Sequence, residues 1–309
     1  MQTSNKHIFI VTYDYPPSNG GIARLCFELK KYLEKKGLNV TVICPQSTST
    51  DAEEDNNVVR LHGRRGILEL RTLKYLRKKT VPGDIVITGN YHPEGMLSLL
   101  SNRETYILAH GAEYLAGKSF FRRCIWPTYR RFILRNASCV IANSHYTETL
   151  VKHCSPNAKT IAIPLAVDAI HFRPTCEKYK DGLLHLCSIS RLEKFKGHDF
   201  IIRTIASLPA KYKQQVRLHL GGKGKYKSAL ERMVTDLGLS DIVSFEGFID
   251  DNKLCDFYSA SHIFILCTRE EADNRNVEGY GLVFCRSASL WNRRYRYSYR
   301  WHSRCCRGE

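Results

Sequence analysis

The sequence predicts an α/β protein made of two doubly wound units, each with a parallel sheet and helices on its faces. Three observations predict this class. Short β-rich runs alternate with helical patterns, beginning with HIFIVT at 7–12 and a helical pattern at 22–36. A polar stretch at 173–182 interrupts this alternation, which then starts again. The length of 309 residues suffices for two domains.

The first unit is expected over residues 1–172. It opens with a strand, a Pro/Gly turn and a helix, after which residues 39–44 are again β-rich. A strand, helix and strand with a crossover of this length form a βαβ unit, so the strands run parallel. Further strands are expected at 84–88, 105–109, 139–142 and 160–163.

The second unit is expected over residues 183–284, after a linker at 173–182. The expected strands are 183–190, 216–222, 242–247 and 262–267, and the expected helices are 198–208, 226–237 and 251–259. Two such domains that face each other across a cleft place ligands at the carboxyl ends of both sheets.

Composition excludes several other classes of protein. The chain is 43% hydrophobic and 25% charged, which is typical of a globular protein and not of a disordered or fibrous one. No apolar run has the length of a membrane span, and the N-terminus lacks the pattern of a secretion signal, so a cytoplasmic protein is expected. The 12 cysteines include no CxxC pair, so neither a metal site nor a disulfide framework is indicated.

Several residues are expected at the carboxyl ends of strands, where ligands bind. Gly20 and Gly21 open a helix after the first strand, although a tight turn alone can require such glycines. Arg191 and Lys196 could hold a diphosphate, or they could be a solvated basic loop. His110 follows a strand and Glu278 follows a Gly/Asn-rich loop; a structural histidine and a solvated carboxylate are the alternatives.

An ordered series of motifs over residues 7–284 resembles the family 4 (group 1) glycosyltransferases of the GT-B fold. The series is YPPSNGGI, HGAEYL, IANSHYTETLV, IPLAVDAIHFRP, SRLEKFKG, HLGGKGKY, VSFEGFI and VEGYGLVF. The resemblance implies a retaining transferase that needs no metal or other cofactor. It would move a sugar from a nucleotide-diphosphate sugar to a glycan or lipid-linked acceptor, typically in bacterial surface polysaccharide or lipopolysaccharide biosynthesis.

The resemblance also implies roles for individual residues. His110 and Glu278 match catalytic positions, the first against the donor sugar and the second as a hydrogen-bonding partner of its hydroxyls. The positions that match the donor diphosphate site are Gly20, Gly21, Arg191, Lys196, Gly281, Leu282 and Val283.

Two positions depart from the family pattern. Leu165-Ala166 replaces the common Asn-Gly of a connecting loop, which is tolerable. Arg286 stands where the family has a second glutamate, which binds the ribose.

The last 25 residues, 285–309, hold seven Arg and one Glu and show no periodicity that could complete the second sheet. One extra base at the Phe284 codon would explain this aberrant tail. The neighbouring frame can then encode VEAQACGTGVIGTATGGIPDAVEE, which resembles the family sequence and supplies a glutamate at position 286. The expected consequence is a chain with little or no activity.

Alternative interpretations remain open. The tail and the net charge of +17 could belong to a nucleic-acid binder. The order of the motifs favours the enzyme instead, and we expect no nucleic-acid partner. The chain could also be an inactive remnant that still binds a nucleotide sugar. Lys118–Arg135, rich in aromatic and basic residues, is either a surface for anionic membranes at the inner face of the cell membrane or an amphipathic helix packed on the sheet.

Overall fold

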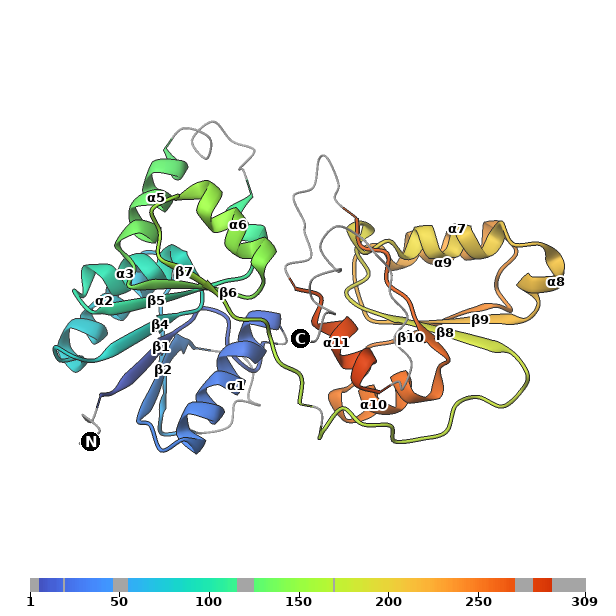
Figure 1. Ribbon diagram of the computed structural model, residues 1–309, viewed down its shortest axis with the longest axis horizontal. Helices are drawn as coiled ribbons and strands as arrows, with labels where there is room; N and C mark the ends of the chain where they lie inside the picture. The colour runs from blue at the N-terminus through green and yellow to red at the C-terminus, as the bar shows by residue number, and fades with distance from the viewer. Residues whose placement is uncertain are drawn as a thin grey trace. The chain divides into compact units, whose positions relative to one another are not determined.

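The computed structural model describes residues 6–18, 20–46, 55–115, 125–168, 170–269 and 280–290. It divides into two compact units, one up to Pro164 and the other from Leu165 (Figure 1). The sequence analysis expected the first unit to extend to residue 172. The predicted α/β class with two parallel sheets is confirmed.

The first unit contains a seven-stranded parallel sheet of order β3-β2-β1-β4-β5-β6-β7. Its strands are β1 (Ile8–Val11), β2 (Val40–Pro45), β3 (Val58–Leu61), β4 (Ile85–Thr88), β5 (Glu104–Ala109), β6 (Cys139–Ala142) and β7 (Thr160–Ala162). Its helices are α1 (Gly21–Lys35), α2 (Ile67–Lys79), η1 (Tyr91–Gly95), α3 (Met96–Leu100), η2 (Ala112–Tyr114), α5 (Trp126–Asn136) and α6 (His145–Cys154).

The central strand β1 explains why this sheet is covered on both faces. All four of its residues are buried, as expected of an apolar run in a parallel sheet. Successive side chains point to opposite faces, so Ile8 and Ile10 pack in the cluster that contains Cys26 of α1, while Phe9 and Val11 pack with Leu76 of α2. The two helices therefore lie on opposite faces of the sheet.

Helix α5 occupies part of the basic aromatic segment 118–135. Ile133 and Leu134 of α5 are fully buried in a core cluster with Val140 of β6 and Val151 of α6. Phe132 and Ile125 are more than half exposed. The described part of this segment therefore forms an amphipathic helix that packs on the sheet and leaves two apolar side chains at the surface; residues 118–124 lie outside the described ranges.

The second unit contains a four-stranded parallel sheet of order β10-β9-β8-β11. Its strands are β8 (Leu184–Ile189), β9 (Val216–Gly221), β10 (Val243–Gly247) and β11 (Ile263–Phe264). Its helices are η3 (Lys194–Lys196), α7 (His198–Ala206), α8 (Ala210–Lys213), α9 (Lys227–Asp236), α10 (Asp251–Ala260) and α11 (Leu282–Ser289).

Helices cover both faces of the second sheet. The core cluster of α7 and α9 includes Leu186 of β8, whereas the next residue, Cys187, packs with α10 and α11 on the other face. Figure 1 shows these two pairs of helices on opposite sides of the strands. The second unit therefore has the same three layers as the first, with a parallel sheet between two layers of helices.

Helix α11 corrects one expectation about the tail. Residues 285–309 show no periodicity that could complete the second sheet, yet their first five residues form the end of α11, which continues to Ser289. Leu290, which follows the helix, is buried in the core cluster of α10 and α11. Burial of the Leu290 side chain stabilises the end of the helix, a tertiary contact that the sequence pattern does not reveal. The rest of the tail, 291–309, lies outside the described residues.

Candidate functional site at the carboxyl ends of the strands

Three loops meet at the carboxyl edge of the second sheet. The loop after β8 is joined to the loop after β9, because the Leu192 N–H donates to the Lys223 carbonyl at 2.9 Å and the Tyr226 N–H donates to the Leu192 carbonyl at 3.0 Å. On its other side, the Phe195 carbonyl accepts the Arg269 N–H at 2.8 Å. The loop over residues 190–197 is therefore held by backbone contacts on two sides.

This loop carries both predicted cations. The Arg191 side chain is 73% exposed, and its Nη1 donates to Glu193 Oε1 at 2.9 Å. Lys196 ends η3, and its Nζ lies 5.0 Å from the centre of the Phe195 ring. Phe195 lies between these two residues in the loop, and its buried side chain anchors the loop to the core. An anion that reaches Arg191 would compete with the Glu193 carboxylate.

Gly281, Leu282 and Val283 form the start of α11. Gly281 precedes the helix with φ +76°, a conformation that favours glycine. Val283 packs in the core cluster of α10, which fixes the orientation of this helix start. Backbone N–H groups at a helix start attract anions. Glu278 lies outside the described residues.

Arg286 lies on α11, with its guanidinium carbon 5.2 Å from the centre of the Phe172 ring. This is the position where the resemblance calls for a glutamate. The face of the Phe172 ring stabilises the positive charge of Arg286, and it would not stabilise the negative charge of a glutamate at this position.

In the first unit, the residues after β1, β4 and β5 meet at the carboxyl edge of the sheet. The Gly89 N–H donates to the Val11 carbonyl at 2.8 Å, and the Gly89 carbonyl lies 2.7 Å from Nε2 of His110. The His110 N–H donates to Glu113 Oε1 at 2.6 Å, and Asn143 Nδ2 donates to the His110 carbonyl at 3.3 Å. Both the ring and the backbone of His110 are thereby held in place.

Gly20 lies against a carboxylate. A Cβ atom added at Gly20 would come within 2.4 Å of Asp14 Oδ2, whereas one added at Gly21 would meet no atom within 4 Å. A side chain at position 20 would therefore have to displace the Asp14 carboxylate, whereas Gly21 faces open space. An anionic ligand at this helix start would lie near the negative charge of Asp14, which opposes its binding.

Sequence reasoning missed Glu94, a buried acid at the same edge. Its side chain lies in η1, its Oε1 accepts the Tyr13 N–H at 3.1 Å, and its Oε2 has no hydrogen-bond partner among the described residues. Burial raises the pKa of Glu94 to about 7. No spacing rule marks this residue, because its contact partner lies 81 positions away.

Sequence reasoning also missed the first turn of α7. His198 is fully buried, and its Nε2 lies 3.3 Å from Ser190 Oγ. Asp199 is buried as well and pairs with Arg203 and Arg269. The motif KGHD in the sequence could have drawn attention to these residues, but their partners could not be read from it.

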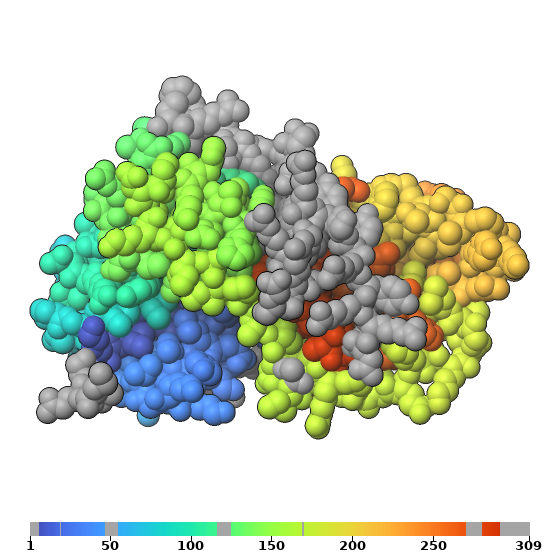
Figure 2. Space-filling model, viewed as in Figure 1, coloured from blue at the N-terminus to red at the C-terminus, as the bar shows by residue number. Residues whose placement is uncertain are grey.

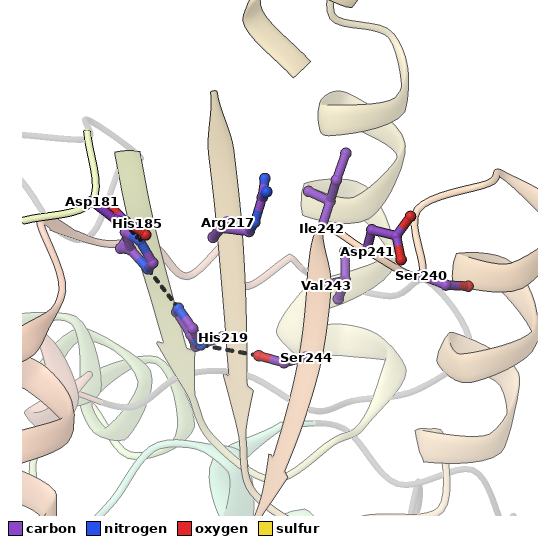
Figure 3. Close-up of a pocket in the computed structure, with 9 residues that line it drawn as sticks. All are labelled: Asp181, His185, Arg217, His219, Ser240, Asp241, Ile242, Val243 and Ser244. Carbon is purple, nitrogen blue, oxygen red and sulfur yellow. Dashed lines mark hydrogen bonds and ion pairs between the residues drawn. The ribbon is translucent and has the colours of Figure 1, made fainter. Parts of the chain in front are cut away.

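A separate pocket lies at the amino ends of β8, β9 and β10, opposite the predicted diphosphate site (Figure 3). It has a volume of about 200 Å³ and includes His185, His219 and Ser244. His185 Nδ1 lies 2.9 Å from His219 Nε2, and His219 Nδ1 lies 3.0 Å from Ser244 Oγ. Because ligands of parallel sheets bind at the carboxyl edge, this pocket does not bear on the donor site.

No group of His, Cys, Asp and Glu side chains within the described ranges is arranged to hold a metal ion. Among the described helices, none combines the length and apolar character needed to cross a bilayer.

Comparison with protein families gives two matches that together cover most of the chain. Residues 19–170 match Glycosyltransferase Family 4, and residues 177–285 match Glycosyl transferases group 1. Both predicted halves of the sequence therefore match the family suggested by the motif series.

One curated relative is the GDP-mannose-dependent alpha-(1-6)-phosphatidylinositol monomannoside mannosyltransferase of Mycobacterium tuberculosis. It is 24% identical over 304 residues, which cover 91% of this chain and 78% of the relative.

Among solved structures, the sucrose-phosphate synthase of Thermosynechococcus elongatus superposes with a TM-score of 0.72 at 20% identity, covering 91% of this chain and 78% of that one. Anabaena HepE in complex with UDP-glucose gives a TM-score of 0.61 at 18% identity, covering 92% and 78%. These likenesses concern the fold. Together with the two family matches and the paired parallel sheets, they show that this chain belongs to the family 4, group 1 glycosyltransferases of the GT-B fold.

Proposed function

We propose that this chain has the sites of a retaining glycosyltransferase that moves a sugar from a nucleotide-diphosphate sugar to a glycan or lipid-linked acceptor. One observation carries the proposal. Arg191 and Lys196 lie on a single loop at the carboxyl edge of the second sheet, and the loops after β9 and β11 hold that loop by backbone hydrogen bonds. A fixed pair of cations suits a diphosphate leaving group.

The two cations would act on the bond between the sugar and the diphosphate. As this bond breaks, negative charge grows on the diphosphate oxygens, and a preorganised guanidinium and ammonium stabilise that charge. Their charges serve the purpose that a divalent cation would serve elsewhere, which supports transfer without a metal. The start of α11 at Gly281, Leu282 and Val283 would add backbone N–H donors.

The first unit would supply groups that meet the sugar and the acceptor. His110 is held by Gly89, Glu113 and Asn143 and can present a ring or a carbonyl edge with little reorganisation. Gly21 leaves open space at the start of α1, where an uncharged acceptor group avoids the repulsion that Asp14 imposes on anions. Glu278 would hydrogen-bond the sugar hydroxyls.

A peripheral contact with an anionic membrane on the cytoplasmic side is part of the proposal. Helix α5 exposes Phe132 beside Arg131 and Arg135, and these two arginines line a hollow of about 260 Å³. In Figure 2, α5 and α6 (green and yellow-green) form much of the visible surface of the first unit. The M. tuberculosis relative is named for a phosphatidylinositol acceptor, which supports a lipid-linked acceptor of bacterial surface glycolipid or polysaccharide synthesis here.

The reading frame after Phe284 decides how much activity to expect. Arg286 packs its cation on Phe172 at the position where a ribose-binding carboxylate is expected. We propose that the frame shifted at the Phe284 codon and that the chain is impaired in turnover, while the loop with Arg191 and Lys196 retains nucleotide binding. The second candidate function, a nucleotide-sugar-binding remnant, rests on this same substitution.

The experiment starts at the gene. The region from the Phe284 codon onward is sequenced in all three frames, and a chain restored to the neighbouring frame is made beside the present one. Both are tested for release of nucleoside diphosphate from GDP-mannose and UDP-glucose. The expected result is turnover by the restored chain and at most slight turnover by the present one. Equal rates would contradict the impairment, and a gene with no continuing α/β frame would contradict the frameshift.

A further inference from the structure

The first turn of α7 joins the two loops that would form the donor site. The loop over residues 190–197 precedes α7 and carries Arg191 and Lys196. The described segment after β11 covers residues 265–269. A residue that contacts both segments can set the spacing between them.

Asp199 makes this connection. Its side chain is 2% exposed, and its Oδ2 accepts a hydrogen bond from Arg269 Nη2 at 3.0 Å. The same oxygen also pairs with Arg203, one turn further along α7. Arg203 lies within the helix, so its ion pair joins no second segment. Of the two ion pairs of Asp199, the one with Arg269 links α7 to the segment after β11.

Backbone contacts place this ion pair beside Lys196. The Arg269 N–H donates to the Phe195 carbonyl at 2.8 Å, so both the side chain and the backbone of Arg269 bind residues that flank Lys196. Gly197 lies against Cys267, since a Cβ atom there would come within 1.9 Å of the Cys267 carbonyl oxygen. The two segments touch with no side chain between them.

His198 fixes the other end of the same loop. Its ring Nε2 lies 3.3 Å from Ser190 Oγ, at the residue before Arg191. The first two residues of α7 thus contact the start of the cationic loop and the end of the segment after β11. Both contacts are buried on the α7 side, where side chains have little freedom to move.

We infer that Asp199 and Arg269 are positioning residues of the donor site: their ion pair fixes the loop of Arg191 and Lys196 against residues 265–269, which follow β11. This inference rests on the proposed function for the location of the donor. The pair does not contact the donor itself. It acts by holding the loop in one position, so that both cations meet the same diphosphate.

The chain offers a matched control, because Asp199 has two arginine partners. Arg269→Gln and Arg203→Gln each remove one cation from the same carboxylate, and each leaves one ion pair, so neither strands a buried charge. Arg269→Lys keeps a positive charge at this position but lacks the planar guanidinium group. The full chain is used for every variant.

Three measurements are made on each variant. Calorimetry gives the affinity for GDP and for UDP, and thermal unfolding confirms that Arg269→Gln and Arg203→Gln have comparable stability. Peptide-resolved amide exchange reports the protection of residues 190–197 and 265–269. We expect Arg269→Gln to weaken nucleotide binding on the order of tenfold and to speed exchange in both peptides. Arg203→Gln should change neither, and Arg269→Lys should restore part of both.

Equal effects of Arg269→Gln and Arg203→Gln, or unchanged exchange in the 190–197 peptide of Arg269→Gln, would overturn the inference. If the wild-type chain binds neither GDP nor UDP, the proposed function fails at binding. The exchange data then decide the inference alone: a difference between the two variants supports the connection between the loops, and no difference overturns it.

Discussion

The buried ring of His198 makes the second unit sensitive to acid. Burial lowers the pKa of His198 from 6.5 to about 4; the Lys196 charge adds to this effect and the Asp199 charge opposes it. The unfolded chain takes up this proton below pH 6.5, whereas the folded chain does so only near pH 4. Because the unfolded state binds more protons in this interval, acidification lowers the free energy of unfolding.

The size of the effect follows from the two pKa values. Each unit of pKa difference is worth about 1.4 kcal/mol, so the full loss is between about 3 and 4 kcal/mol, and most of it has occurred by pH 4.5. His198→Gln removes the titrating ring. The stability advantage of wild type over this variant should therefore shrink by between about 2 and 3 kcal/mol from pH 7.5 to pH 4.5.

Urea unfolding at four pH values between 4.5 and 7.5 measures this, with pulsed hydrogen exchange of β8 and β9 peptides to follow the second unit. Ser190→Ala is the control, because it removes the hydrogen bond to His198 without removing the ring. It should cost a similar free energy at every pH, of about 1 kcal/mol. A wild-type advantage over His198→Gln that stays constant across this pH range would refute the reasoning.

Two further predictions concern stability. Burial raises the pKa of Glu94 to about 7, so the folded chain loses stability as the pH rises from 4.5 to 7. In urea titrations, Glu94→Gln should be up to about 3 kcal/mol more stable than wild type at pH 8, and it should show no such gain at pH 4.5. Gly197 has φ +77° and no room for a Cβ beside the Cys267 carbonyl, so Gly197→Ala should cost more than about 3 kcal/mol. Gly37→Ala, at φ +78° with open space around it, should cost only about 1 kcal/mol in the same unfolding assay, and equal costs would contradict the steric argument.

Much of the fold could be predicted from local patterns. The expected strand at 7–12 and the expected helix at 22–36 correspond to β1 and α1, because a buried parallel strand and an amphipathic helix each have a visible period. Strand β3 was missed: it is four half-buried residues at the sheet edge, too short and too mixed to show alternation. The strand expected at 262–267 is only Ile263–Phe264; the Ile265 N–H still donates to the Cys187 carbonyl of β8, and four residues later the Arg269 N–H donates to the Phe195 carbonyl.

In the candidate site, too, some residues could be predicted from the sequence and others could not. His110 follows β5 directly, and Arg191 and Lys196 lie on the loop after β8, so the sequence can place them at a carboxyl edge. The contact of Asp199 with Arg269 spans 70 positions, and that of Glu94 with Tyr13 spans 81. Such pairs come from the order of strands in the sheet, which spacing along the chain does not reveal.

The most direct test of the account is nucleotide binding to the loop over residues 190–197. Calorimetry is run with GDP and with UDP in the presence of EDTA, on wild type, Lys196→Gln and the control Lys194→Gln, which removes the same charge from an exposed position in the same short helix. We expect wild type and Lys194→Gln to bind one of the two nucleotides without metal, and Lys196→Gln to bind it at least about tenfold more weakly. Binding that ignores Lys196, or that requires a divalent ion, would contradict the account.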